Sequence, residues 1–417
     1  MKFAIITIGS QGDIDPFIAL GKRLQSHGHT VRIAAFNRFE EYIKSVGFEY
    51  VPLTGDASEV IRLLIGEQVS PFQYFRNLAV LLNPIRNEFL SDVVSACEGM
   101  DAILYSLLGS VAWHVADKLN IPCFRVFFCP ADPTKKFPAM TAPELPLGFA
   151  YNRFTFQCGD LLWTHATRKL LNGWRVSMGL SPIRPFSFPY RNLHGKSVPT
   201  LYAYSPLIAP KPADWDENRY LTGYLTYHTQ TEWTPDKSLV DFLNAGNKPI
   251  YIGFGSMVGG SFPQVLDIVL ESLSITKQRA VLSAGWGGLQ GRHLPEYVHQ
   301  VEFVPHEWLF QHVAAVVHHG GAGTTAAGLR AGVPSIIVPF GGDQPYWGNR
   351  IYQLGVGPKP IMRKKLNTQR LTSAISEAVG NPEIIANAKR IGEKLRAEDG
   401  AGNAVKIIEQ IIKVEAG

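Results

Sequence analysis

The stretch AVVHHGGAGTT at residues 315–325 carries most of the information about the fold. Residues 315–318 are typical of a short buried strand, and residues 324–331 are typical of the helix after it. The glycines between them let backbone N–H groups converge at the start of that helix, where the partial positive charge suits a phosphate. The stretch therefore predicts an α/β unit whose turn binds an anion.

A second group of polar residues follows the next expected strand. Residues 335–338 are typical of a buried strand, and Asp343 and Gln344 come a few residues later. A carboxylate accepts two hydrogen bonds and an amide both donates and accepts, which suits the neighbouring hydroxyls of a sugar. With the histidine at the strand end, this pair predicts a site for a sugar attached to a diphosphate, as in a nucleotide-sugar enzyme.

Length and composition allow two domains, each with its own core. The chain has 417 residues, of which 46% are hydrophobic, and a formal net charge of +5. The densest basic cluster, at residues 363–365, is typical of a solvated surface. Because nucleic-acid binding favours a stripe of basic residues with interleaved aromatics, we expect no nucleic-acid partner.

Cysteine content and hydrophobic patterning bear on the compartment. The four cysteines show neither metal-ligand spacing nor disulfide density, which favours a reducing compartment. Residues 2–7 are too short for the apolar region of a signal peptide, and we interpret them as a first strand. No apolar run approaches the roughly 18 residues that a membrane span needs. We therefore expect a soluble, cytoplasmic protein.

Expected strands and helices alternate through most of the chain. One alternating set runs from residue 3 to residue 128, and a second begins at residue 249. Such alternation favours parallel, doubly wound sheets. Residues 130–199 are rich in proline and aromatic residues and break the pattern, while residues 205–235 have the composition of a linker.

The predicted fold class is therefore α/β, with two Rossmann-like domains facing across a cleft. We expect the first domain over residues 1–207 and the second over residues 208–396. Parallel sheets of this kind bind ligands outside the carboxyl ends of their strands, so the ligand site is expected in the cleft.

Four motifs in order along the chain carry a family resemblance. They are GSQGDIDPF at residues 9–17, GFGSM at residues 253–257, HHGGAGTT at residues 318–325 and FGGDQPYWGN at residues 340–349. With these motifs the chain resembles the inverting family 1 glycosyltransferases, which have the glycosyltransferase B fold. It is most similar to sterol 3-β-glucosyltransferases and bacterial natural-product glycosyltransferases. The resemblance also implies that a C-terminal helix, about residues 397–417, crosses back onto the first domain.

The resemblance implies a role for each residue of the donor site. His319 falls at the position that contacts the donor diphosphate, and Phe303 matches the aromatic that stacks on the nucleobase. The full implied set is Ser256, His319, Gly321, Gly323 and Thr324 for the diphosphate, Phe303 and Val304 for the nucleobase, and Asp343 and Gln344 for the sugar.

Asp13 is the candidate catalytic base. Plant members of the family have a histidine at this position, oriented by an aspartate that corresponds here to Ser106. The absence of both partners is consistent with Asp13 acting directly, since an aspartate with an ordinary pKa near 3.9 is ionised at pH 7. The alternative interpretation of Asp13 is an N-cap of a helix beginning at Ile14.

One position leaves the choice between a uridine and a thymidine nucleotide open. Plant members carry a glutamate that holds the ribose hydroxyls, and the matching residue is Ala327. Sterol-type members share this lack. The donor is expected to be UDP-glucose, with thymidine diphosphate sugars as the alternative because their ribose has no 2′-hydroxyl.

The predicted function is transfer of a hexose from a nucleoside diphosphate to a hydroxyl of a lipophilic molecule such as a sterol, triterpenoid, flavonoid or macrolide. No metal cofactor is expected, and a lipophilic acceptor is compatible with peripheral contact with a membrane. The acceptor expectation comes from the aromatic residues between residues 72 and 188, which include Tyr74, Phe75, Phe149, Phe154 and Trp163.

Three other functions compete with this one. A nucleotide-sugar epimerase on the same fold would fill the cleft with polar groups, whereas this region is aromatic. A non-catalytic binding protein would not need Asp13, His319 and Asp343 together. A nicotinamide oxidoreductase is disfavoured because the loop at residues 9–12 lacks the third glycine of a dinucleotide fingerprint.

Overall fold

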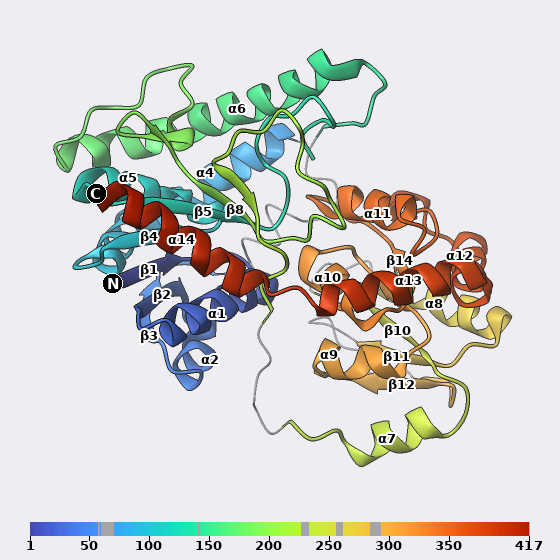
Figure 1. Cartoon of the computed structure of the whole chain (residues 1–417). Coiled ribbons are helices and arrows are strands. Elements are labelled where there is room, and N and C mark those ends of the chain that lie inside the picture. The colour runs from blue at the N-terminus through green and yellow to red at the C-terminus, as the bar shows by residue number, and fades with distance from the viewer. Residues whose placement is uncertain are drawn as a thin grey trace. The chain divides into compact units, whose positions relative to one another are not determined.

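The computed structural model describes residues 1–56, 59, 71–140, 142–226, 233–255, 262–283 and 293–416. These residues fall into two compact units. The first unit takes the described residues up to Thr226 and those from Asp399 onward, and the second takes residues 233–398 (Figure 1).

The first unit is built on a parallel sheet. Among the described residues it has seven strands, in the order β3-β2-β1-β4-β5-β8-β9. Every residue of β4 and β5 is buried, as in parallel sheets that are covered on both faces. The strands are β1 (Lys2–Ile6), β2 (Thr30–Phe36), β3 (Glu49–Leu53), β4 (Ala102–Tyr105), β5 (Cys123–Phe127), β8 (Thr200–Tyr202) and β9 (Arg219–Leu221).

Helices surround this sheet, and α6 is the longest of those in the described part of the unit. It packs against α4, while α14 packs against α1 (Figure 1). No helix in the described ranges is long and apolar enough to cross a membrane. The helices are α1 (Gln11–Ser26), α2 (Glu40–Ser45), α4 (Pro71–Cys97), α5 (Ala112–Leu119), α6 (Gly148–Ser177) and α14 (Gly400–Ala416), and a short hairpin joins β6 (Asn192–Leu193) to β7 (Lys196–Ser197).

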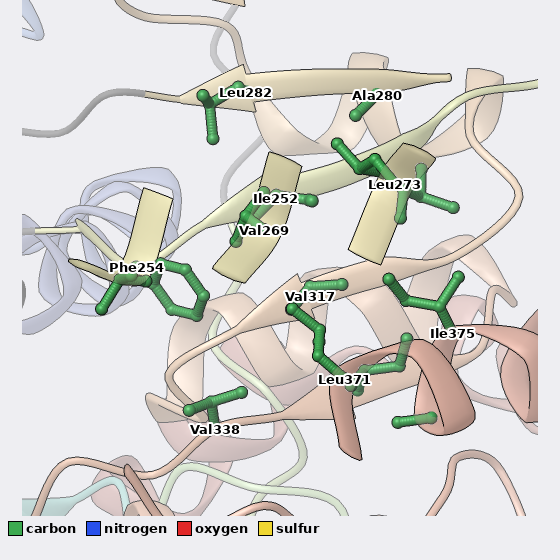
Figure 2. Packing of buried hydrophobic residues seen from close by; sticks show 14 of the residues in the cluster. Ile252, Phe254, Val269, Leu273, Ala280, Leu282, Val317, Val338, Leu371 and Ile375 are labelled. Carbon is green, nitrogen blue, oxygen red and sulfur yellow. The ribbon is translucent and has the colours of Figure 1, made fainter. Parts of the chain in front are cut away.

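The second unit has a parallel sheet of five strands among its described residues, in the order β12-β11-β10-β13-β14. Its core lies between the sheet and two helices, where Ile252 and Val317 pack with Leu371 of α12 (Figure 2). The strands are β10 (Ile250–Gly253), β11 (Ala280–Ser283), β12 (Val298–Val301), β13 (Val316–His318) and β14 (Ser335–Ile337), and the helices are α7 (Lys237–Asn244), α8 (Phe262–Thr276), α9 (His306–Leu309), α10 (Ala322–Ala331), α11 (Gln344–Gln353), α12 (Thr368–Gly380) and α13 (Pro382–Arg396).

Two features differ from the sequence expectation. The region expected to break the α/β pattern contains α6, a helix of 30 residues. The expected linker at residues 205–235 contains β9, which pairs with β8 and so extends the first sheet. The boundary expected between residues 207 and 208 therefore lies inside the first unit, because the chain must pass β9 before it leaves that sheet.

The C-terminal helix α14 belongs to the first unit. Its residues Ala404, Val405 and Ile408 are fully buried, and α14 packs against α1. Asp399 pairs with Arg23 of α1, and Asn403 donates a hydrogen bond to the Thr222 carbonyl (3.0 Å). The last part of the chain therefore completes the core of the first unit.

Replacing Ile408 by alanine should destabilise the protein. Removing a buried aliphatic side chain costs about 2–5 kcal/mol, because the packing around it relaxes only in part. Chemical denaturation of Ile408→Ala should show this loss. Val414→Ala, on the same helix with a side chain that is 81% exposed, should unfold like the wild type. Equal stability of the two variants would contradict the docking of α14.

Candidate active site

The carboxyl ends of three strands meet at one edge of the second sheet. The register of the parallel strands pairs Gly253 of β10 with His318 of β13, and His318 with Ile337 of β14. The segments that follow these strands therefore leave the sheet side by side. In parallel α/β sheets this edge is where ligands bind.

The helix after β13 begins with backbone N–H groups that no side chain caps. Its N-cap is Gly321, and its first backbone hydrogen bond runs from the Thr325 N–H to the Gly321 carbonyl (2.9 Å). The N–H groups of residues 322–324 are therefore left for another acceptor, at the positive end of the helix. Gly323 is exposed and Thr324 is half-buried, so this turn can receive an anion.

His319 lies directly beside this turn. A Cβ atom on Gly321 would collide with Nε2 of His319, so glycine at this position leaves space for the ring. Burial, and then the nearby His306, lower the pKa of His319 to about 4. The imidazole is therefore neutral at pH 7 and donates one N–H group, which suits a phosphate oxygen.

His318, in contrast, shapes the turn from within. It is fully buried, and its Nδ1 accepts a hydrogen bond from the Gly320 N–H (3.1 Å). Burial lowers its pKa well below the ordinary value, so the ring stays neutral. Of the two adjacent histidines, His319 is thus the one that can reach a ligand.

Asp343 and Gln344 stand at the start of α11, after β14. The Gln344 Oε1 atom accepts hydrogen bonds from the N–H groups of Phe340 (2.8 Å) and Gly341 (3.2 Å). These two donors fix the orientation of the amide. The Gln344 oxygen is therefore already engaged, and only its amide N–H groups remain to donate, whereas the sequence predicted that Gln344 would both donate and accept.

A tryptophan holds the Asp343 carboxylate. The Trp347 indole N–H donates to Oδ2 of Asp343 (2.8 Å), and Trp347 is only 1% exposed. Trp347 is not among the site residues expected from the sequence. Its spacing of four residues from Asp343 at a helix start is the signal that could have found it, since side chains at that spacing meet on one helix face.

Of the other residues expected at the donor site, the structure describes Phe303 and Val304. Phe303 follows β12 with 75% of its side chain exposed, while Val304 packs partly against the core. An exposed aromatic ring is available for stacking. Ser256 lies outside the described residues. Within the described ranges, no three His, Cys, Asp or Glu side chains are placed to hold a metal ion.

Asp13 stands at the start of α1 in the first unit. The helix begins at Gln11 with Ser10 as its N-cap, so Asp13 is the third helical residue and not the N-cap of a helix at Ile14. The Ser10 N–H (2.7 Å) and hydroxyl (3.1 Å) both donate to Oδ2 of Asp13. No described residue donates to Oδ1, which leaves that oxygen for a ligand.

The turn around Asp13 fixes its carboxylate. Gly9 has a φ of +148°, and a Cβ there would collide with the Asp13 side chain. The Ser106 hydroxyl forms no hydrogen bond with Asp13; it accepts hydrogen bonds from the Ile8 N–H (3.3 Å) and the Gly109 N–H (3.2 Å). Ser106 therefore supports the loop that carries Asp13.

Burial raises the pKa of Asp13 to about 6, and the two hydrogen bonds from Ser10 oppose this rise. The carboxylate is still mostly ionised at pH 7, and it is a stronger base than an ordinary aspartate. A group with a pKa near the working pH suits general-base chemistry.

The aromatic residues expected at the acceptor side fall into different environments. Phe156 is buried in contact with Phe137, so this pair belongs to the core. Phe149 and Phe154 are 65% and 60% exposed, and Trp163 is half-buried. The side chains of Tyr74 and Phe75 lie outside the described residues. The set is therefore not one uniform apolar lining.

Two family models match the chain, one in each half. Residues 3–138 match the glycosyltransferase family 28 N-terminal domain. Residues 281–411 match the C-terminal domain of proteins like erythromycin biosynthesis protein CIII. The chain belongs to the glycosyltransferases of the B fold.

Among curated relatives, a sterol 3-beta-glucosyltransferase of Emericella nidulans is 36% identical over 422 residues, which cover 98% of this chain and 30% of the relative. One of Arabidopsis thaliana is 35% identical over 423 residues, which cover 97% of this chain and 65% of the relative. The chain thus spans between about a third and two thirds of the length of these relatives.

Solved structures share its fold. The kitacinnamycin glycosyltransferase superposes with a TM-score of 0.72 at 21% identity, covering 98% of both chains. The glycosyltransferase VinC, solved in complex with dTDP, has a TM-score of 0.69 at 18% identity and covers all of both chains. Both are described as glycosyltransferases.

Replacing His319 by alanine should weaken binding of a free nucleoside diphosphate. Losing one hydrogen bond to a charged group costs about 1.5–3 kcal/mol. Calorimetry with UDP and TDP should show this loss. His312→Ala, at an exposed histidine of the same unit, serves as the control and should bind like the wild type. Unchanged affinity of the His319 variant would remove His319 from the diphosphate site.

Replacing Asp343 by alanine should weaken binding of the intact sugar nucleotide more than binding of the free diphosphate, because the sugar and not the diphosphate is expected to reach this carboxylate. Trp347→Phe should produce a smaller loss in the same direction, since it removes the indole N–H that orients Asp343. Equal losses for both ligands in either variant would contradict the assignment of Asp343 to the sugar.

Proposed function

We propose that this protein is an inverting glycosyltransferase. It moves a hexose, glucose in the first instance, from a nucleoside diphosphate to a hydroxyl of a lipophilic small molecule such as a sterol. The sterol 3-beta-glucosyltransferases that are 35–36% identical over nearly the whole chain support this acceptor class.

The proposal rests on one observation. At the carboxyl ends of the strands of the second sheet, the start of α10, which can receive an anion, lies next to the pair Asp343 and Gln344, which can receive a sugar. The uncapped N–H groups of α10 and the neutral His319 would receive the diphosphate. The carboxylate of Asp343 and the amide of Gln344 come from the adjacent strand end and would receive the sugar. Phe303 would stack on the nucleobase.

In the reaction, the acceptor oxygen attacks the anomeric carbon while the bond to the diphosphate oxygen breaks. The leaving diphosphate takes the bonding electron pair, and its charge is stabilised by the α10 N–H groups and His319. The acceptor proton passes to Oδ1 of Asp13, whose other oxygen is held by Ser10. Attack from the face opposite the leaving group inverts the anomeric configuration. No step requires a metal ion.

The nucleotide is proposed to be UDP. Ala327 packs partly against the core, so this position offers no polar group to the ribose. Discrimination between UDP and TDP would then depend on the nucleobase and not on a ribose clamp. We therefore expect UDP-glucose to be the better donor, with TDP-glucose accepted more slowly.

A donor and acceptor screen tests the proposal. UDP-glucose and TDP-glucose would each be incubated with a sterol, a flavonoid, a free sugar and a peptide, and the products read by mass spectrometry. We expect one added hexose on the sterol, with a β linkage by NMR. Transfer only to free sugars or peptides would contradict the proposed acceptor, and conversion of the donor alone to its epimer would favour an epimerase. The relatives named above are transferases, and none is an epimerase.

Replacing Asp13 by asparagine should nearly abolish transfer and leave donor binding almost unchanged, because Asp13 belongs to the first unit and the donor motifs to the second. General-base positioning contributes roughly 10²–10⁴ in rate. Turnover and donor affinity should be measured on one preparation. Asp15→Asn, at an exposed residue of the same helix, is the control. Turnover of the Asp13 variant within about threefold of wild type would exclude this role.

The pH dependence gives a separate test of Asp13. The ionised carboxylate is the active form, so kcat/KM should be high above the pKa and fall as the pH drops through about 6. Ser10→Ala removes a hydrogen bond that stabilises the carboxylate, so the acidic limb should move to higher pH. A limb that stays in place in this variant would show that Ser10 does not act on the titrating group.

A further inference from the structure

We propose that the start of α6, with the loop before it, is a docking surface for an anionic lipid membrane. The proposal goes beyond the proposed function, because membrane binding requires neither donor nor acceptor. The purpose of membrane binding rests on the proposed function, since a lipophilic acceptor partitions into bilayers.

Four large apolar side chains are exposed within ten residues of one another. Leu145 is 47% exposed, Leu147 62%, Phe149 65% and Phe154 60%. We name these four side chains the α6 tip surface. A group of exposed apolar residues of this size marks an interaction site more often than a single exposed leucine does.

The fold itself directs these side chains outward. Polar residues of the first turns of α6 face the protein instead: the buried Asn152 donates to the Lys135 carbonyl (2.8 Å), and the Thr155 hydroxyl accepts from the Ala139 N–H (2.9 Å). The first two turns of α6 thus bury a polar side chain and expose Phe149 and Phe154, whereas an ordinary surface helix turns its apolar residues toward the core. The exposure of these two rings is therefore a feature of the folded state.

Basic residues accompany the α6 tip surface. Lys135, Lys136 and Arg153 are all exposed, and the Lys135 ammonium lies 5.9 Å from the centre of the Phe149 ring. Neither Lys136 nor Arg153 forms an ion pair with a described residue. Apolar and aromatic side chains next to unpaired basic groups are the combination that binds the interface of an anionic bilayer.

The segment that carries the α6 tip surface has a net positive charge. Residues 135–154 contain three Lys and Arg against one Glu, a net charge of +2. A second copy of this chain would present the same positive charge and be repelled, whereas an anionic lipid surface would be attracted.

The other end of α6 is anchored in the first unit. Arg175 donates to Nδ1 of His114 (2.9 Å) and to the Asp117 carboxylate (2.7 Å), both on α5. The helix thus holds the α6 tip surface at a fixed place on the unit, away from this anchor along the helix (Figure 1).

Vesicle cosedimentation of the full chain, without donor or acceptor, tests the proposal. The wild type should bind vesicles of 70% phosphatidylcholine and 30% phosphatidylserine at least about tenfold more tightly than pure phosphatidylcholine vesicles, and salt should weaken this binding. Leu147→Ser with Phe149→Ser should reduce binding to the mixed vesicles at least about fivefold, and Lys136→Glu with Arg153→Glu should do the same, since one basic residue near such a surface contributes about fivefold.

Matched variants in the second unit provide the controls. Ile275→Ser replaces an apolar side chain that is 58% exposed, and Lys364→Glu with Lys365→Glu reverses two exposed charges. Both should bind vesicles like the wild type, and melting curves would show that every variant is folded. Wild type that does not bind, or controls that lose as much binding as the test variants, would overturn the proposal.

Three further outcomes separate this proposal from self-association and from the proposed function. Light scattering that shows a dimer, lost in the Leu147 and Phe149 variant, together with absent vesicle binding, would assign the surface to self-association and overturn a membrane role. Vesicle binding by a protein that transfers no sugar would support the surface while the proposed function fails. Sugar transfer by a protein that binds no vesicles would do the reverse.

Discussion

The parallel register of the second sheet is the constraint on which the site depends. It places the ends of β10, β13 and β14 side by side, with His318 between Gly253 and Ile337. A slip of one residue would turn every side chain of a strand to its other face. The buried core of Ile252, Val317 and their helix partners prevents such a slip, so hydrophobic packing determines where the polar groups of the site meet (Figure 2).

Both units have the same local feature at the end of a strand. A glycine gives a neighbouring side chain the space it needs: Gly321 leaves room for the His319 ring, and Gly9 leaves room for the Asp13 carboxylate. Burial then moves both pKa values, keeping the histidine neutral and making the aspartate a stronger base. In the proposed function, the same type of strand end would thus hold a neutral hydrogen-bond donor in one unit and a base in the other.

The sequence predicted the parts of the fold that follow from local pattern. The glycine-rich turn after His318 and the alternation of apolar strands with helices are local signals, and the two-domain α/β fold follows from them. The helix α6 was missed because the proline and aromatic content of residues 130–199 masks it, and β9 was missed because a three-residue edge strand has no periodicity of its own.

The features of the site that the sequence did not predict have a similar cause. The residue types of Asp343 and Gln344 indicated a sugar site, but only the fold shows that the Gln344 oxygen already accepts hydrogen bonds from Phe340 and Gly341. Trp347 and Ser10 act through hydrogen bonds that depend on the geometry of helix starts. The division of the aromatic residues between core and surface also depends on which way α6 turns, which its composition does not reveal.

A crystal structure of the protein soaked with UDP is the most direct test of the central claim. The account predicts the diphosphate at the start of α10, with its oxygens within hydrogen-bond distance of the N–H groups of residues 322–324 and of the His319 ring, and the uracil against Phe303. Density for the nucleotide at any other place, or a diphosphate that contacts neither the α10 start nor His319, would contradict it.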